Sequence, residues 1–187
     1  MSRAIIDEER GRCLSPLEHS DLDKIRNWRN SQMKILRQTL PLTDLTQDKW
    51  YHTISFSDNQ AIFALVEKKD GKFCLFGYCG LVNINLTSRH AELSFIVDPR
   101  RVSDETLYRQ DFESALTMLC RFGFSELNLH RIYTETYAFR EDHLRILESF
   151  GFQREGILRQ HYFANDSFHD SIINAILYEE WKKIKEK

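Results

Sequence analysis

The chain has 187 residues, of which 42% are hydrophobic and 13 are Phe, so it can build an ordinary core, and its length predicts one domain over residues 1–187. Its formal net charge is −2, with acidic and basic residues mixed along the chain, which excludes an electrostatic case for binding nucleic acid or an anionic membrane surface. The apolar runs are too short to cross a bilayer, and the first residues lack the blocks of a signal peptide, so we expect a cytoplasmic protein.

The four cysteines do not have the spacing of zinc ligands. Cys74 and Cys79, the nearest pair, are five positions apart, whereas zinc ligands usually come as closer pairs. No carboxylate and histidine cluster has zinc-like spacing either. We therefore predict no metal site and reduced, mostly buried thiols at Cys13, Cys74, Cys79 and Cys120.

The first half of the chain predicts strand, two helices and a hairpin. "GRCLSPL" is typical of a strand, and Ser20 is the expected N-cap of the helix that follows. Thr43 or Thr46 is expected to cap a second helix. Residues 61–85 predict a β-hairpin with its turn at "KDG" and a long return strand.

The second half predicts alternating strands and helices. "HAELSFIVD" alternates, so Glu92 is expected to face the opposite side from Leu93 and Phe95. Four more elements are predicted after this strand: a helix over 105–122, a strand at "HRIYTETY", a helix ended by Gly151 and a hairpin turning at Asn165–Asp166–Ser167. A short charged tail follows them. This order predicts an α/β (α+β) fold, with a central mixed sheet and helices on both faces.

Several local motifs resemble those of the GNAT superfamily of N-acetyltransferases, in the branch of ribosomal-protein N-terminal and amino-sugar acetyltransferases. The resemblance covers nearly the whole chain. Its motifs are "IRNWRN", "GYCGLVNIN", "AELSFIVDP", "FSELNLHRIY", "ESFGFQREGILR", "SFHDSI" and "EEW".

The resemblance implies a single GNAT-type domain that uses acetyl-CoA as co-substrate. The strand matching "AELSFIVD" would splay from its neighbour and offer backbone N–H groups to the pantetheine arm, and a glycine-rich turn at the next helix would hold the pyrophosphate. The positions assigned to acetyl-CoA are Phe95, Ile96, Val97, Arg100, Arg101, Tyr108, Arg109, Gln110, Asp111, Phe112 and Arg140.

Two elements depart from the family pattern. There is no glycine between Gly80 and Gly123, and the two glycines of the pyrophosphate turn fall on Gln110 and Phe112, of which Phe112 is expected to pack inward. In the later helix, Arg140 replaces the usual Asn and His143 the usual Ser or Ala, while Leu147 stands where some members have a tyrosine general acid. The sequence therefore predicts a degenerate pyrophosphate loop and changed handling of the co-substrate.

Glu92 and His143 are the candidate catalytic residues. Glu92 matches the acid on the family's central strand and would take a proton from the attacking amine. Its alternative is a structural ion pair with Arg89, His90 or Arg131. His143 would protonate the leaving thiolate, and its pKa is expected to fall at the helix N-terminus; its alternative is an exposed surface histidine.

The expected acceptor site involves Trp28, Arg29, Asn30, Tyr78 and His161. For Trp28 the alternative to substrate binding is packing in the core. For Asn30 the alternative is a structural role as the C-cap of a helix. "HD" in "SFHD" is expected to support the last hairpin by hydrogen bonds.

The resemblance predicts a cytoplasmic N-acetyltransferase for a small-molecule amine, most plausibly an amino sugar. Direct transfer needs neither a metal nor a covalent enzyme intermediate. Two alternatives remain open, a GNAT-fold binding domain that has lost CoA and a peptide N-terminal acetyltransferase. A homodimer formed through edge strands is expected by resemblance.

Overall fold

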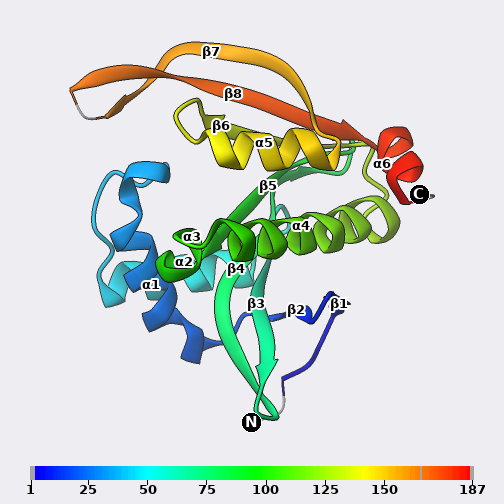
Figure 1. Cartoon of the computed structure of the whole chain (residues 1–187). Helices are drawn as coiled ribbons and strands as arrows, with labels where there is room; N and C mark the ends of the chain where they lie inside the picture. The colour runs from blue at the N-terminus through cyan, green and yellow to red at the C-terminus, as the bar shows by residue number, and fades with distance from the viewer. Residues whose placement is uncertain (1–2, 165, 186–187) are drawn as a thin grey trace. The chain divides into compact units, whose positions relative to one another are not determined.

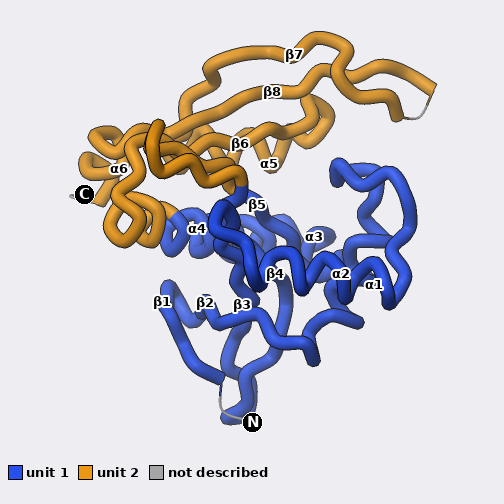
Figure 2. Tube along the Cα trace, turned by 180° about the vertical axis from the view of Figure 1, so that it is seen from behind, with its two compact units in different colours: residues 1–82, 94–119 blue, residues 83–93, 120–187 orange. Residues whose placement is uncertain are grey.

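A computed structural model describes residues 3–164 and 166–185. The chain divides into two compact units, residues 1–82 with 94–119 and residues 83–93 with 120–187 (Figure 2). We call them unit 1 and unit 2. The boundary falls within the strands β4 and β5 and the helix α4, and the single domain expected over residues 1–187 stays a prediction.

Unit 1 contains an antiparallel series of four strands. β1, β2, β3 and β4 pair in that order. The strands are β1 (Asp7–Glu9), β2 (Arg12–Pro16), β3 (Ala61–Lys69) and β4 (Lys72–Asn85), and the helices are α1 (Leu22–Ser31), α2 (Asp44–Ser55), α3 (Pro99–Val102) and α4 (Glu105–Arg121), with 3-10 turns at His19–Asp21 and Met33–Ile35 (Figure 1).

Unit 2 contains a parallel strand pair and a long antiparallel hairpin. β5 (His90–Val97) begins here and pairs in parallel with β6 (Arg131–Tyr137). β6 pairs with β8 (Ser167–Leu177), which pairs with β7 (Gln153–Ala164), both antiparallel (Figure 1). The helical segments are the π-turn Phe122–Glu126, α5 (Glu141–Phe150) and α6 (Tyr178–Lys185). The mixed α/β fold class is confirmed.

Local capping signals account for several element boundaries. Thr43 caps α2, its side chain accepting a hydrogen bond from the Thr46 amide, as predicted. Gly151 ends α5 at φ +121°, also as predicted. The prediction for Ser20 is wrong, because Glu18 caps the preceding 3-10 turn and Asp21 is the N-cap residue of α1. Of the expected hairpin turn at 165–167, Asn165 lies outside the described residues.

The cores of both units are apolar and contain the thiols. Cys13, Ala64 and Val66 form one cluster in unit 1. Cys13, Cys79 and Cys120 are buried and Cys74 is half-buried, all four as free thiols, which confirms that prediction. Burial raises the pKa of Cys79 and Cys120, so these thiols stay protonated. No helix in the described part of the chain is long and apolar enough to span a membrane.

Candidate active site

Glu92 is a nearly buried carboxylate with an amide partner. Its side chain is on β5 with 3% of the residue exposed, and Asn83 Nδ2 donates a hydrogen bond of 2.8 Å to its Oε2. Asn83 has φ +51°, a left-handed conformation that Asn tolerates better than most residues and that interrupts the alternation of β4. This irregularity in β4 therefore accompanies the contact that orients Glu92.

Two of the three basic residues proposed as structural partners of Glu92 have other contacts. Arg89 donates to the backbone and side-chain oxygens of Asn128, both at 2.6 Å. Arg131 forms an ion pair with Glu155 and lies over the ring of Tyr133. The Asn83 amide donates to the Glu92 carboxylate, an ion pair with His90 stays open as the alternative, and the catalytic role of Glu92 stays a prediction.

A second carboxylate, Glu135, lies on the same face of the parallel strand pair. Glu92 is directly opposite Tyr133, and Glu135 is two residues further along β6, so the three side chains share a face. His161 Nδ1 is 3.0 Å from Glu135 Oε1 and 3.1 Å from Ser171 Oγ. His161 is among the residues expected from the sequence, whereas Glu135 is not.

His143 is buried beside a charged neighbour. It is in the first turn of α5, only 8% exposed, with Nδ1 3.5 Å from an Arg140 guanidinium nitrogen. The pKa of His143 lies well below its usual value, first because of burial and second because of the charge of Arg140. The predicted direction is confirmed, whereas the alternative of an exposed histidine is wrong.

At neutral pH His143 is therefore an uncharged imidazole. It can donate one N–H hydrogen bond, but it does not carry the extra proton of an imidazolium. Leu147, one turn later, is fully buried. The predicted role of His143 toward a leaving thiolate stays a prediction. Because its pKa is low, His143 would act on that thiolate as a neutral hydrogen-bond donor.

The other half of β5 is packed on both faces in unit 1. The ring of Phe95 lies 4.6 Å from that of Phe112 and 5.9 Å from that of Tyr108, centroid to centroid. Phe112 is fully buried and packs inward, as predicted. Ile96 packs in a cluster with Ile25 and Tyr78 on the other face.

The end of β5 is held by its neighbours. The Val97 carbonyl accepts a 2.9 Å hydrogen bond from Gln32, and the Asp98 amide donates to the Phe76 carbonyl at 2.8 Å. A Cβ on Gly77 would lie only 2.5 Å from the carbonyl oxygen of Ile96. Only glycine therefore allows β4 to approach β5 so closely at this point.

Buried ion pairs link α3 and α4 to the sheet of unit 1. Arg101 contacts both carboxylate oxygens of the fully buried Asp111, at 2.5 and 2.8 Å, and also Glu67 at 2.8 Å. Arg12 binds Asp111 and Gln110, each at 3.0 Å. Burial alone would raise the pKa of Glu67, but Lys69 and Arg101 outweigh it and lower that pKa.

Two further arginines expected near the phosphates also face carboxylates. Arg100 forms a 2.5 Å contact with Asp98, which lowers the pKa of Asp98 chiefly through this hydrogen bond. Arg109 pairs with Glu113 at 3.3 Å.

The positions expected to form the pyrophosphate turn lie inside α4. The helix begins at Glu105, so the amides of Gln110 and Phe112 are in its interior, where they bond to carbonyls four residues earlier. The helix start is capped instead by Asp104, whose Oδ1 accepts from the Leu107 amide at 2.9 Å. This placement argues against a phosphate at residues 110–112.

The residues expected to bind the acceptor amine are mostly packed in unit 1. Trp28 and the buried Tyr78 belong to one apolar cluster, so core packing holds for Trp28. Arg29 lies over the ring of Trp50, 5.0 Å from its centroid. Asn30 is not a C-cap, because α1 runs to Ser31; its side chain instead binds the backbone of Leu42 at 2.8 and 2.9 Å.

The final hairpin is supported as the sequence suggested. His169 Nε2 lies 3.1 Å from the Ala164 carbonyl, and Asp170 accepts a 2.8 Å hydrogen bond from the Gln160 amide. Among the described residues, no group of His, Cys, Asp and Glu is arranged to hold a metal ion.

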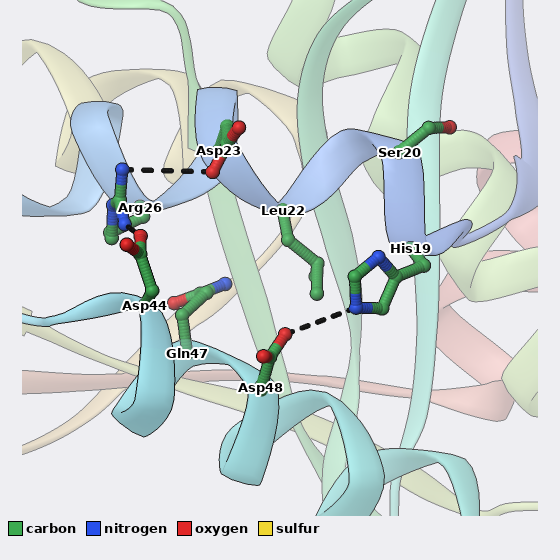
Figure 3. A pocket seen from close by; sticks show the side chains of 8 residues that line it. All are labelled: His19, Ser20, Leu22, Asp23, Arg26, Asp44, Gln47 and Asp48. Atoms are coloured by element: carbon green, nitrogen blue, oxygen red, sulfur yellow. Dashed lines mark hydrogen bonds and ion pairs between the residues drawn. The ribbon is translucent and has the colours of Figure 1, made fainter.

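A polar pocket of about 280 Å³ lies between α1 and α2 in unit 1 (Figure 3). Its acids face basic side chains: Asp48 is 3.1 Å from His19, and Arg26 pairs with both Asp23 and Asp44. Three aspartates therefore share one arginine and one histidine in this lining, which is net negative while His19 is neutral. No feature of the sequence pointed to this pocket.

The matched family is the acetyltransferase (GNAT) domain, whose model covers residues 14–173. The chain belongs to the GNAT acetyltransferase family. Its fold agrees: the structure of spermidine N-acetyltransferase from Vibrio cholerae, in complex with CoA and spermine, superposes with a TM-score of 0.78 at 23% identity, over 93% of this chain and 99% of that one.

Two GNAT relatives illustrate the range of similarity. The spermidine N(1)-acetyltransferase of Escherichia coli is 27% identical over 176 residues, 90% of this chain and 87% of that protein. The uncharacterized N-acetyltransferase YoaA of Bacillus subtilis is 30% identical over 113 residues, 60% of each chain. The chain is accordingly an acyltransferase of the type that acetylates amines.

Proposed function

We propose that this GNAT protein transfers an acetyl group from acetyl-CoA to a primary amine of a small polycation of the polyamine class. The observation that carries the proposal is the pair of carboxylates, Glu92 and Glu135, on one face of β5 and β6. Two carboxylates with little exposure favour a substrate with more than one positive charge. The spermidine acetyltransferases among the relatives support this choice over an amino sugar.

The two carboxylates have different roles in the proposal. Glu92, oriented by Asn83, accepts a proton from the ammonium form of the attacking amine, directly or through one water. Glu135 binds a second ammonium group beside His161, since one carboxylate can accept about four hydrogen bonds. The acceptor thereby enters with its charge distributed over both groups.

The transfer itself requires no covalent enzyme intermediate. The free amine attacks the thioester carbonyl, and an N–C bond forms as the C–S bond breaks. The nitrogen then loses a second proton, which passes through water to the leaving thiolate, so the products are the amide and the thiol. Backbone N–H groups near Phe95–Val97 would stabilise the negative charge on the carbonyl oxygen. His143, as a neutral imidazole, would donate a hydrogen bond to the leaving sulfur.

The experiment is an acceptor screen by mass spectrometry with acetyl-CoA, using spermidine, glucosamine and a short peptide. We expect acetylated spermidine. Acetylation of glucosamine alone would instead support the amino-sugar function expected from the sequence, and acetylation of the peptide alone would support N-terminal acetylation. No product from any amine would reject the acetyltransferase function.

A pair of variants tests the role of Glu135. In Glu135→Gln the KM for spermidine should rise about ten- to hundredfold, because a hydrogen bond between two charged groups is lost. The kcat should change little. Glu155→Gln, which removes an exposed carboxylate of the same unit, is the matched control and should leave both constants unchanged. The expected homodimer and the cytoplasmic location stay predictions.

A further inference from the structure

The residues of this chain suit the acyl pantetheine half of acetyl-CoA better than its nucleotide diphosphate half. We propose that the chain recognises its acetyl donor as an acyl pantetheine thioester, with the diphosphate and nucleotide contributing little to binding. The inference rests on the proposed function for the identity of the acetyl donor. It concerns the start of α4, where the family resemblance places the pyrophosphate.

The N-cap of α4 disfavours a phosphate at this helix end. A helix N-terminus attracts phosphate because its first amides lack partners and carry partial positive charge. Here Asp104 Oδ1 accepts from the Leu107 amide at 2.9 Å, and the Asp104 carbonyl accepts from the Tyr108 amide at 2.8 Å. Glu105 adds a second carboxylate in the first turn. One amide of this helix end is therefore already bonded to a carboxylate, and the two acids of the turn repel a diphosphate.

Side-chain packing also disfavours a phosphate at the start of α4. A phosphate approaches a backbone closely only where glycine removes the Cβ, and no glycine occurs from residue 81 to residue 122. The first two turns of α4 are also packed against β5 by Tyr108 and Phe112, whose rings contact that of Phe95. Phe112 is fully buried, so α4 cannot move outward without exposing it.

The nearby arginines are already paired with acidic side chains. Arg101 is bound by Asp111 and Glu67, and Arg12 by Asp111 and Gln110. Arg100, the most exposed of the three, contacts Asp98. Each guanidinium thus already has a carboxylate partner, and a diphosphate would have to compete with these ion pairs for a cation.

The pantetheine arm can be bound without a glycine turn and without a free cation. It carries amide groups that hydrogen-bond to a strand backbone, and the parallel pairing of β5 with β6 ends at Glu92 opposite Tyr133, whereas β5 continues to Val97. Backbone recognition is independent of side chains and of glycine. The part of acetyl-CoA near the thioester therefore retains a place in this chain.

The test measures binding by isothermal titration calorimetry with the full chain and three probes, CoA, pantetheine and adenosine 3′,5′-bisphosphate. We expect Kd values for CoA and pantetheine within about tenfold of each other, and no binding of the bisphosphate at millimolar concentration. A CoA affinity a hundredfold or more above that of pantetheine would overturn the proposal. Binding of the bisphosphate alone, or no binding of pantetheine, would overturn it as well.

Asp104→Asn examines the cap directly, because Asn caps a helix about as well as Asp but is uncharged. CoA should bind about two- to fivefold more tightly to this variant, with pantetheine unchanged. Asp58→Asn removes another exposed carboxylate of unit 1 and is the matched control, with no change expected for either probe. Equal CoA affinities in both variants would overturn the role of Asp104.

A second readout separates this inference from the proposed function. S-acetylpantetheine should support acetyl transfer with a kcat/KM within about tenfold of that for acetyl-CoA. If acetyl-CoA is used and S-acetylpantetheine is not, the inference fails while the proposed function stands. If neither thioester acetylates any amine but CoA and pantetheine bind equally, the proposed function fails while the inference stands.

Discussion

Asn83 donates a 2.8 Å hydrogen bond from Nδ2 to Oε2 of Glu92. The bond joins a left-handed residue of β4 to the nearly buried carboxylate of β5. It leaves the carboxylate able to accept further hydrogen bonds, including one from an ammonium group. Asn83 is thus a positioning residue for the proposed base.

Removing the Asn83 amide should lower turnover without unfolding the protein. Asn83→Gly keeps the positive φ and removes the side chain, so kcat should fall about ten- to hundredfold with little change in KM. Asn83→Ala should lose the same activity and also about 1 kcal/mol of stability, because Ala is strained at φ +51°. Steady-state kinetics and urea denaturation measure both. Activity of Asn83→Gly within twofold of wild type would rule out this role.

The close approach of β4 and β5 makes Gly77 intolerant of a side chain. Gly77→Ala should reduce the free energy of unfolding by about 1–3 kcal/mol, since its Cβ would lie 2.5 Å from the Ile96 carbonyl oxygen. Gly156→Ala is the matched control: a Cβ there meets nothing within 4 Å, so the change should stay within about 0.5 kcal/mol. If Gly77→Ala and Gly156→Ala both changed the free energy of unfolding by less than about 0.5 kcal/mol in urea denaturation, β5 would be able to move away from the new Cβ without cost.

Two acids on α4 should differ sharply in their contribution to stability. Asp111→Ala leaves Arg101 and Arg12 without their shared buried partner and should cost about 3–5 kcal/mol. Glu113→Ala breaks contacts to Arg10 and Arg109 that are partly exposed, and should cost under about 1 kcal/mol. Chemical denaturation at neutral pH compares them. A small loss in Asp111→Ala would mean that the network relaxes around the missing carboxylate.

The low pKa of His143 gives acid sensitivity with a defined sign. In the folded state His143 stays neutral below its usual pKa of 6.5, whereas the unfolded chain takes up a proton there, so acid favours unfolding. Relative to His143→Gln, the wild type should lose about 1.4 kcal/mol per pH unit below 6.5, until the folded pKa is reached. Denaturation at several pH values measures this difference. A pH-independent difference would contradict the low pKa.

Local chemistry made many elements predictable from the sequence. The Thr43 cap, the Gly151 stop and the "KDG" turn, where Asp70 and Gly71 have φ of +48° and +76°, each depend on a few neighbouring residues. The sequence predicts that residues 178–181 continue the last hairpin and that a charged tail follows. The structure instead forms α6 there, with Trp181 buried.

The candidate site was less predictable, because it depends on tertiary contacts. Polar residues occur on both faces of "RIYTETY", with Thr134 and Thr136 buried on one and Glu135 on the other, so alternation could not single out Glu135. The pyrophosphate positions, Gln110 and Phe112, come from the resemblance alone. They fall inside the helix predicted over 105–122, and α4 does begin at Glu105, so the helix bounds and the resemblance conflict at these positions. The burial of His143 depends on packing that helical periodicity alone did not indicate.

The account depends most on Glu92 acting as the proton acceptor for the attacking amine. The direct measurement is the rate of acetyl transfer to the amine found in the acceptor screen, for wild type and Glu92→Gln, across pH 6 to about 9. We predict a kcat about 10²- to 10⁴-fold lower in Glu92→Gln, with circular dichroism unchanged. A kcat within about threefold of wild type, with the same pH profile, would contradict it.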